Sequence, residues 1–181
     1  MKMNEPYFEN LPYIGTLYLQ TTYLFFEEPI LFLCVDAHGN KFLCLCAEFR
    51  DDYRWIVTET DNATLKKMIT NELPTYEVFH KSKGKKYIVR WSGYETDKES
   101  VALINFDDIP ELDLPEKNSF LDISPAQQST LLKYLQKFSF TFNAPKICDW
   151  TTKKHRKIYP NTHFKNKIQS NWTMAKGVVG L

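Results

Sequence analysis

Two nearly continuous apolar runs, residues 30–35 and 41–47, lie on either side of the short polar stretch Asp36-Ala37-His38-Gly39-Asn40. Apolar runs of this length, separated by turn residues, are typical of paired strands. Gly39 can adopt the positive φ that a tight turn needs. This part of the chain therefore predicts a β-hairpin.

Further strands are predicted where β-branched and aromatic residues dominate, at residues 16–26, 53–58, 87–91 and 100–106. Glu27-Glu28-Pro29 breaks the first of these, and the last two are expected to be neighbours. Residues 107–122, which contain Pro110 and Pro115, are expected to form an extended connection.

Helices are predicted at two places. Asp61 or Thr60 can cap a short helix that runs to about residue 70 and has Leu65, Met68 and Ile69 on one face. Pro74 opens a short turn toward Phe79. Ser124-Pro125 is a typical helix start, and leucines at helical spacing follow it to about residue 137. The expected fold class is α+β: an antiparallel sheet with a few short helices, followed by an amphipathic helix and a basic C-terminal segment.

The composition, and a start of the chain that does not resemble a targeting signal, favour a globular cytoplasmic protein. Hydrophobic residues make up 43% of the chain and charged residues 25%, and such a chain can bury a core. The first ten residues carry Glu5 and Glu9 and do not resemble a secretory signal. The most apolar stretch, residues 23–35, is interrupted by charges and proline and is too short to cross a membrane. The four cysteines are expected to be reduced.

Charge divides the chain into two parts. Residues 1–125 carry 13 Lys and Arg against 21 Asp and Glu, a net charge of −8, whereas residues 126–181 carry 10 against 1, a net charge of +9. Such asymmetry suggests a tail that binds something acidic. We therefore divide the chain into an acidic α+β domain, residues 1–123, and a helix with a basic, aromatic-rich segment, residues 124–181, which either packs on the first domain or binds outside it.

Three short stretches carry a resemblance to a domain-of-unknown-function family of small uncharacterised bacterial proteins. They are Tyr13-Ile14-Gly15-Thr16-Leu17, Pro29-Ile30-Leu31-Phe32 and Trp55-Ile56-Val57, and the sequence Ile109-Pro110-Glu111-Leu112-Asp113-Leu114-Pro115 is also similar. The resemblance covers about residues 11–121. It implies a compact α+β domain from bacteria or their phages, and it brings no catalytic residues.

Candidate reactive groups are better explained as structural. Cys44 and Cys46 share one face of a strand, with Cys34 on the partner strand and His38 in the turn, but their spacing is not that of a zinc site. None of the four histidines lies in a nucleophile motif. The acidic pairs Asp51-Asp52 and Asp107-Asp108 fit solvated turns beside strand ends. We assign no catalytic residue, no metal and no cofactor.

The basic segment is the strongest candidate for a binding site, because its cations can contact phosphates or carboxylates while its aromatic rings stack. The Lys81 to Lys86 turn could extend it. The candidate residues for partner or nucleic-acid binding are Lys153, Lys154, His155, Arg156, Lys157, Tyr159, Phe164, Lys165, Lys167 and Trp172. The segment could fold back on the acidic domain, dock on an acidic partner protein or bind nucleic acid.

Three functions are consistent with these observations. The first is a non-catalytic bacterial or phage interaction protein that binds and occludes a partner, as antitoxins, immunity proteins and anti-defence proteins do. The second is a nucleic-acid-binding regulator that uses the basic C-terminal third. The third is a nuclease or other hydrolase whose site is assembled only in the folded chain.

Overall fold

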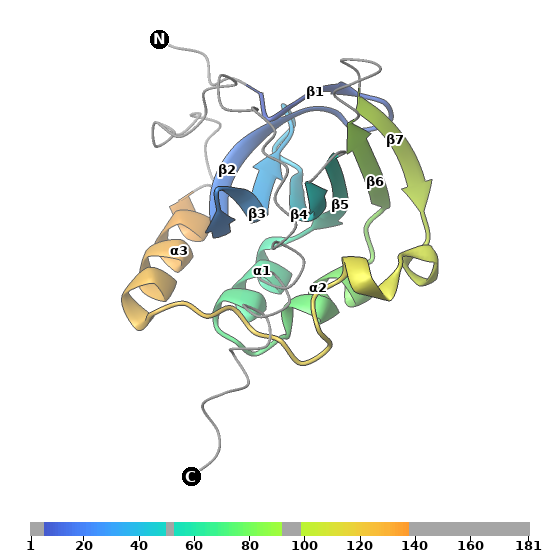
Figure 1. The fold of residues 1–181 in the computed structure, drawn as a ribbon. Coiled ribbons are helices and arrows are strands. Elements are labelled where there is room, and N and C mark those ends of the chain that lie inside the picture. Colours follow the sequence, from blue (N-terminus) through green and yellow to red (C-terminus); the bar gives the residue numbers. More distant parts are fainter. Residues whose placement is uncertain (1–5, 50–52, 92–98, 138–181) are drawn as a thin grey trace.

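The computed structural model of this chain describes residues 6–49, 53–91 and 99–137. Its main element is a seven-stranded antiparallel sheet in which the strand order follows the chain, from β1 to β7 (Figure 1). The strands are β1 (Phe8–Leu11), β2 (Gly15–Phe26), β3 (Glu28–Val35), β4 (Lys41–Phe49), β5 (Tyr53–Thr60), β6 (Lys86–Trp91) and β7 (Glu99–Ile104). The helices are α1 (Asn62–Ile69), α2 (Thr75–Lys81) and α3 (Pro125–Lys137), with the 3-10 turns η1 (Phe106–Asp108) and η2 (Glu111–Asp113). The prediction of an antiparallel sheet with a few short helices is confirmed.

The sheet is strongly curved, so that its first strand contacts its last, β1 against β7. Figure 1 shows β1 and β2 crossing over one end of the sheet while α1 and α2 lie at the other end. The pairing of β2 with β3 shifts register between Leu19 and Thr21 and again on both sides of Leu24. Such bulges bend a strand and increase its twist, which accounts for much of the curvature. Neither this curvature nor β1 was predicted.

The predicted central hairpin is confirmed as β3 and β4, with Leu33 opposite Leu43. In the turn between them Gly39 has a φ of 85°. The Asp36 carboxylate accepts hydrogen bonds of 2.8 Å from the backbone N–H groups of His38 and Asn40. Aspartate side chains commonly close turns in this way, so the turn is held by its own first residue.

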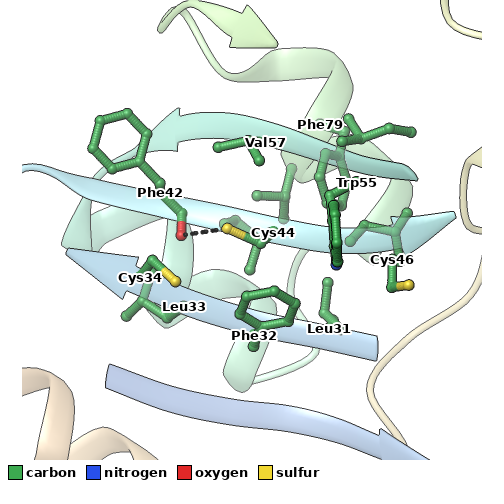
Figure 2. Packing of buried hydrophobic residues seen from close by; sticks show 14 of the residues in the cluster. Leu31, Phe32, Leu33, Cys34, Phe42, Cys44, Cys46, Trp55, Val57 and Phe79 are labelled. Atoms are coloured by element: carbon green, nitrogen blue, oxygen red, sulfur yellow. Dashed lines mark hydrogen bonds between the residues drawn. The ribbon is translucent and has the colours of Figure 1, made fainter. Parts of the chain in front are cut away.

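The core takes side chains from both faces of the central strands, because nearly every residue of β3, β4 and β5 is buried or half-buried. One face carries Phe32 and Trp55, which lie close together in Figure 2. Phe8 of β1 is fully buried, and its ring packs edge-on against Trp55 with centroids 5.2 Å apart. Edge-to-face packing at this distance is favourable for aromatic rings. β1 therefore closes over the aromatic face of the sheet.

Both helix predictions that named capping residues are confirmed. Asp61 caps α1 by accepting a 2.8 Å hydrogen bond from the backbone N–H of Thr64, and Leu65, Met68 and Ile69 are buried as expected. Ser124 caps α3: its Oγ accepts a 3.3 Å hydrogen bond from the backbone N–H of Gln127, and its own backbone N–H donates to Gln127 Oε1 at 2.8 Å. This reciprocal pair is a capping box. After Pro74, where a turn was predicted, the chain forms the helix α2.

The connection from β7 to α3 was predicted to be extended, but it contains η1 and η2 and is fastened to the helices. The backbone N–H of Thr75 donates to the carbonyl of Ser119 at 2.9 Å, and the Asn71 side chain donates to the carbonyl of Leu121 at 3.2 Å. The Gln128 side chain then joins α3 to the last turn of α1, with a 2.7 Å bond to the carbonyl of Ile69. Helices and connection therefore form one packed layer at this end of the sheet.

Candidate interaction surface

The turn between β1 and β2 presents an aromatic ring at its tip. The backbone N–H of Ile14 donates to the carbonyl of Leu11 at 3.3 Å, which closes a four-residue turn with Pro12 second and Tyr13 third. Tyr13 has a φ of 67°, the left-handed value that the third residue of a type II turn requires. Glycine or asparagine is usual there because a Cβ makes this conformation unfavourable.

Tyr13 is also highly exposed, with 84% of its surface open to solvent. Six large apolar or aromatic side chains are exposed in the described part of the chain, and Tyr13 is the most exposed of them. The others are Phe25, Leu103, Leu112, Phe120 and Tyr134. Tyrosine is enriched at protein interfaces because its ring buries a large area and its hydroxyl can bond at the rim. Sequence reasoning missed this residue, although Pro12 before it was a signal for the turn.

The three described cysteines are structural. Cys34 and Cys44 lie on the same side of neighbouring strands, and the Cys44 thiol donates to the carbonyl of Phe42 at 3.6 Å (Figure 2). Burial raises the pKa of the Cys34 thiol, and its hydrogen bond with Cys44 raises it further. Burial likewise raises the pKa of the Cys46 thiol. Thiols of this kind stay protonated near neutral pH and are poor nucleophiles. Cys148 lies outside the described residues.

The two described histidines, His38 and His80, lie in different environments. His38 is exposed in the β3–β4 turn. His80, near the end of α2, packs against Phe106 with the rings tilted and their centroids 4.8 Å apart, and its Nδ1 is 3.5 Å from a carboxylate oxygen of Glu77. Within the described ranges, no three His, Cys, Asp or Glu side chains come together as a metal site would need. His155 and His163 lie outside those ranges.

The acidic pair Asp107-Asp108 is placed as predicted, exposed in a turn just after a strand. The Asp108 carboxylate accepts a 3.1 Å bond from the Asn105 side chain, so it stabilises its own turn. The other pair, Asp51-Asp52, falls outside the described residues.

The basic turn before β6 is partly exposed and partly structural. Lys81, Lys83 and Lys85 are exposed, whereas the Lys86 ammonium donates to the carbonyl of Ser82 at 2.8 Å. Burial lowers the pKa of Lys86. The Lys81 ammonium, at the end of α2, is 3.2 Å from a carboxylate oxygen of Glu77. Lys83 and Lys85 are therefore the exposed cations of this turn that a partner could contact, and Lys86 holds the turn.

The ten residues predicted to bind a partner or nucleic acid all lie in residues 138–181, outside the described part of the chain. They are Lys153, Lys154, His155, Arg156, Lys157, Tyr159, Phe164, Lys165, Lys167 and Trp172. Their role stays a prediction.

In the ranges that the structure describes, no helix is long and apolar enough to cross a membrane. Comparison with models of protein families, with curated proteins and with solved structures finds no match to this chain. The resemblance of residues 11–121 to a family of small bacterial proteins therefore stays a prediction.

Proposed function

We propose that this chain is a non-catalytic interaction protein that binds and occludes a partner protein, as antitoxins, immunity proteins and anti-defence proteins do. The observation that carries the proposal is Tyr13, an exposed aromatic ring held in a left-handed conformation at a hairpin tip. A left-handed non-glycine residue costs about 1–2 kcal/mol, and an exposed ring recovers none of it by packing inside the fold. Burial of the ring against a partner would supply favourable binding free energy that offsets this conformational cost.

The surroundings of the reactive groups support the non-catalytic part of the proposal. The thiols of Cys34, Cys44 and Cys46 are buried in the sheet, and burial keeps those of Cys34 and Cys46 protonated by raising their pKa. The His80 ring contacts Phe106, and its Nδ1 faces the carboxylate of Glu77. Nucleophilic catalysis requires a nucleophile and a base within hydrogen-bond reach of each other, and these groups have structural partners instead.

The test is affinity capture with the full-length chain as bait, comparing the natural sequence with two substitutions of Tyr13. Tyr13→Phe keeps the ring and should retain the partner. Tyr13→Asn removes the ring but suits the left-handed turn, so it should lose at least ten-fold in partner recovery while remaining folded. Equal recovery by all three proteins would remove Tyr13 from the interface and with it the basis of the proposal.

A second candidate, a nucleic-acid-binding regulator, is favoured by one observation, the exposure of Lys83 and Lys85 in the turn between α2 and β6. Together with the basic C-terminal third, these cations would contact phosphates and release counterions. Binding to a single-stranded oligonucleotide should then weaken steeply as salt is raised, and Lys83→Gln with Lys85→Gln should reduce the salt dependence by about two charges. Nuclease treatment of the captured material separates this candidate from the first.

A further inference from the structure

The negative charge of the described domain is concentrated in one segment. Over residues 6–49, 53–91 and 99–137 the sequence carries 16 Asp and Glu against 12 Lys and Arg, a net charge of −4. Residues 105–124 alone carry 6 acids against one lysine, a net charge of −5. The rest of the described chain is therefore nearly neutral, and residues 105–124 form what we call the acidic ledge.

The acidic ledge is fastened to the rest of the fold, and most of its charges face solvent. Its backbone is tied to Thr75 at the start of α2 through Ser119 and to Asn71, just after α1, through Leu121. Figure 1 shows its later part running beneath these helices toward α3. Four of its six carboxylates are exposed: Asp107, Asp108, Glu111 and Asp122. Like charges on a fastened segment attract cations more strongly than the same charges on a mobile loop, because little ordering is needed on binding.

The ledge also exposes apolar side chains between its charges. Leu112 is 75% exposed and Phe120 is 39% exposed. A partner suited to this surface should therefore carry cations together with large apolar or aromatic groups.

The same chain contains a segment with this composition. Residues 150–172 carry six Lys and Arg and no acid, and Trp150, Tyr159, Phe164 and Trp172 are distributed among them. The sequence charge of this segment is thus +6, against −5 on the acidic ledge.

The segment can reach the ledge. Only residues 138–149 separate the end of α3 from Trp150. Twelve residues span up to about 40 Å, well beyond the radius of gyration of about 14 Å typical of a domain of this size. A tethered segment acts at an effective concentration in the millimolar range, so even a weak contact would be well populated.

We propose that the acidic ledge binds residues 150–172 of the same chain. The ledge carboxylates pair with the lysines and arginine of the segment, while Leu112 and Phe120 contact its aromatic rings. An acidic protein or nucleic acid that uses the basic segment must then displace it from the ledge, so the ledge sets how readily the segment is available. This inference is independent of Tyr13, which lies on the β1–β2 turn.

The test uses the full-length chain and trypsin, which cleaves after lysine and arginine only where the backbone is accessible. In the ledge variant, Asp107→Asn, Glu111→Gln and Asp122→Asn remove three charges and add no cleavage site. In the control variant, Glu9→Gln, Glu27→Gln and Glu72→Gln remove three exposed charges elsewhere. The initial rate of cleavage at residues 153–157 is measured at low and at high salt, and near-ultraviolet circular dichroism checks that each variant is folded.

At low salt, cleavage should be about 5- to 10-fold faster in the ledge variant than in the control, and high salt should remove the difference by screening. Equal rates in the two variants would overturn the proposal. Zero-length carbodiimide cross-linking gives a second readout: bonds from ledge carboxylates to Lys153, Lys154 or Lys157 within a monomer support it. Cross-links that appear only in a dimer would assign the segment to a second copy, and their absence would overturn the contact altogether.

Discussion

The Arg54 guanidinium in β5 donates a 2.7 Å hydrogen bond to the Asp113 carboxylate in η2, joining the sheet to a segment 59 residues further along the chain. The Asp113 side chain is only 8% exposed and that of Arg54 26%. Charge-assisted bonds in such partly buried places are stronger than surface ion pairs, so this bond holds the acidic segment against the sheet.

Breaking this ion pair should destabilise the fold. We expect Asp113→Ala to lower the free energy of unfolding by about 2–3 kcal/mol, because it leaves a partly buried guanidinium without its main partner. The matched control is Glu111→Ala in the same segment, whose exposed ion pair with Lys117 spans 3.1 Å. That change should alter stability by less than about 0.5 kcal/mol. Urea unfolding measures both, and similar losses would contradict the assignment.

Tyr13 should be a position at which stability can be raised. Replacing it by asparagine, which tolerates a left-handed backbone, should increase the free energy of unfolding by about 0.5–1 kcal/mol. Tyr13→Val should lower it, because a β-branched side chain is worse there. Thermal melts of both variants test this. A stabilised Tyr13→Asn protein that no longer captures a partner would mean that binding and stability compete at this residue.

Gly84 should not accept any side chain. A Cβ at this position would lie 2.6 Å from Glu59 Cβ and 2.7 Å from the Glu59 carbonyl oxygen. Because backbone atoms cannot move aside as a flexible side chain can, we expect Gly84→Ala to cost about 2 kcal/mol or more. The comparison is Gly39→Ala, where a Cβ meets open space and only the positive φ is unfavourable. That variant should lose about 1 kcal/mol, and the reverse order of losses would refute the expectation.

Stability should decline at alkaline pH because of the buried thiols. The pKa values of Cys34 and Cys46 are raised above their ordinary 9.0 by burial, so the folded protein holds protons that the unfolded chain releases. The contribution of these thiols to the free energy of unfolding should be constant below about pH 9. Above it, each thiol should lower the free energy of unfolding by up to about 1.4 kcal/mol per pH unit. The lowered pKa of Lys86 acts in the opposite direction, between its folded value and 10.5.

The measurement is urea unfolding between pH 7 and pH 10 in the natural protein and in Cys34→Ala with Cys46→Ala. The variant should be less stable throughout because of the cavities it contains, but its stability should fall less steeply above pH 9. Parallel curves would mean that the thiols do not contribute to the pH dependence.

The sequence predicted those elements whose signals are local. The β3–β4 hairpin follows from two apolar runs around Gly39, and both capped helices follow from Asp61 and Ser124. β1 could not be predicted, because its four residues show no recognisable strand pattern. Phe8 is buried only because the folded chain places it against the distant Trp55. The Arg54–Asp113 bond and the attachment of residues 105–124 to the helices depend on contacts between distant positions, which periodicity does not encode.

The candidate surface was predicted less well. Charge asymmetry pointed to the basic segment, which lies outside the described residues. The acidic character of residues 107–122 can be read from the sequence, but which of their carboxylates are exposed became visible only in the structure. Tyr13 was not predicted as part of a binding surface, because neither its exposure nor its positive φ follows from the identity of the residue alone.

The order of the strands has a consequence for how this protein folds during its synthesis. Since each strand pairs with its neighbour along the chain, a chain leaving the ribosome can extend its sheet one strand at a time, and short sequence separations favour rapid pairing. The contact of β1 with β7 must wait until residue 104 has emerged. Until then the two edge strands of the sheet do not contact each other, and an uncovered edge strand can pair with another chain.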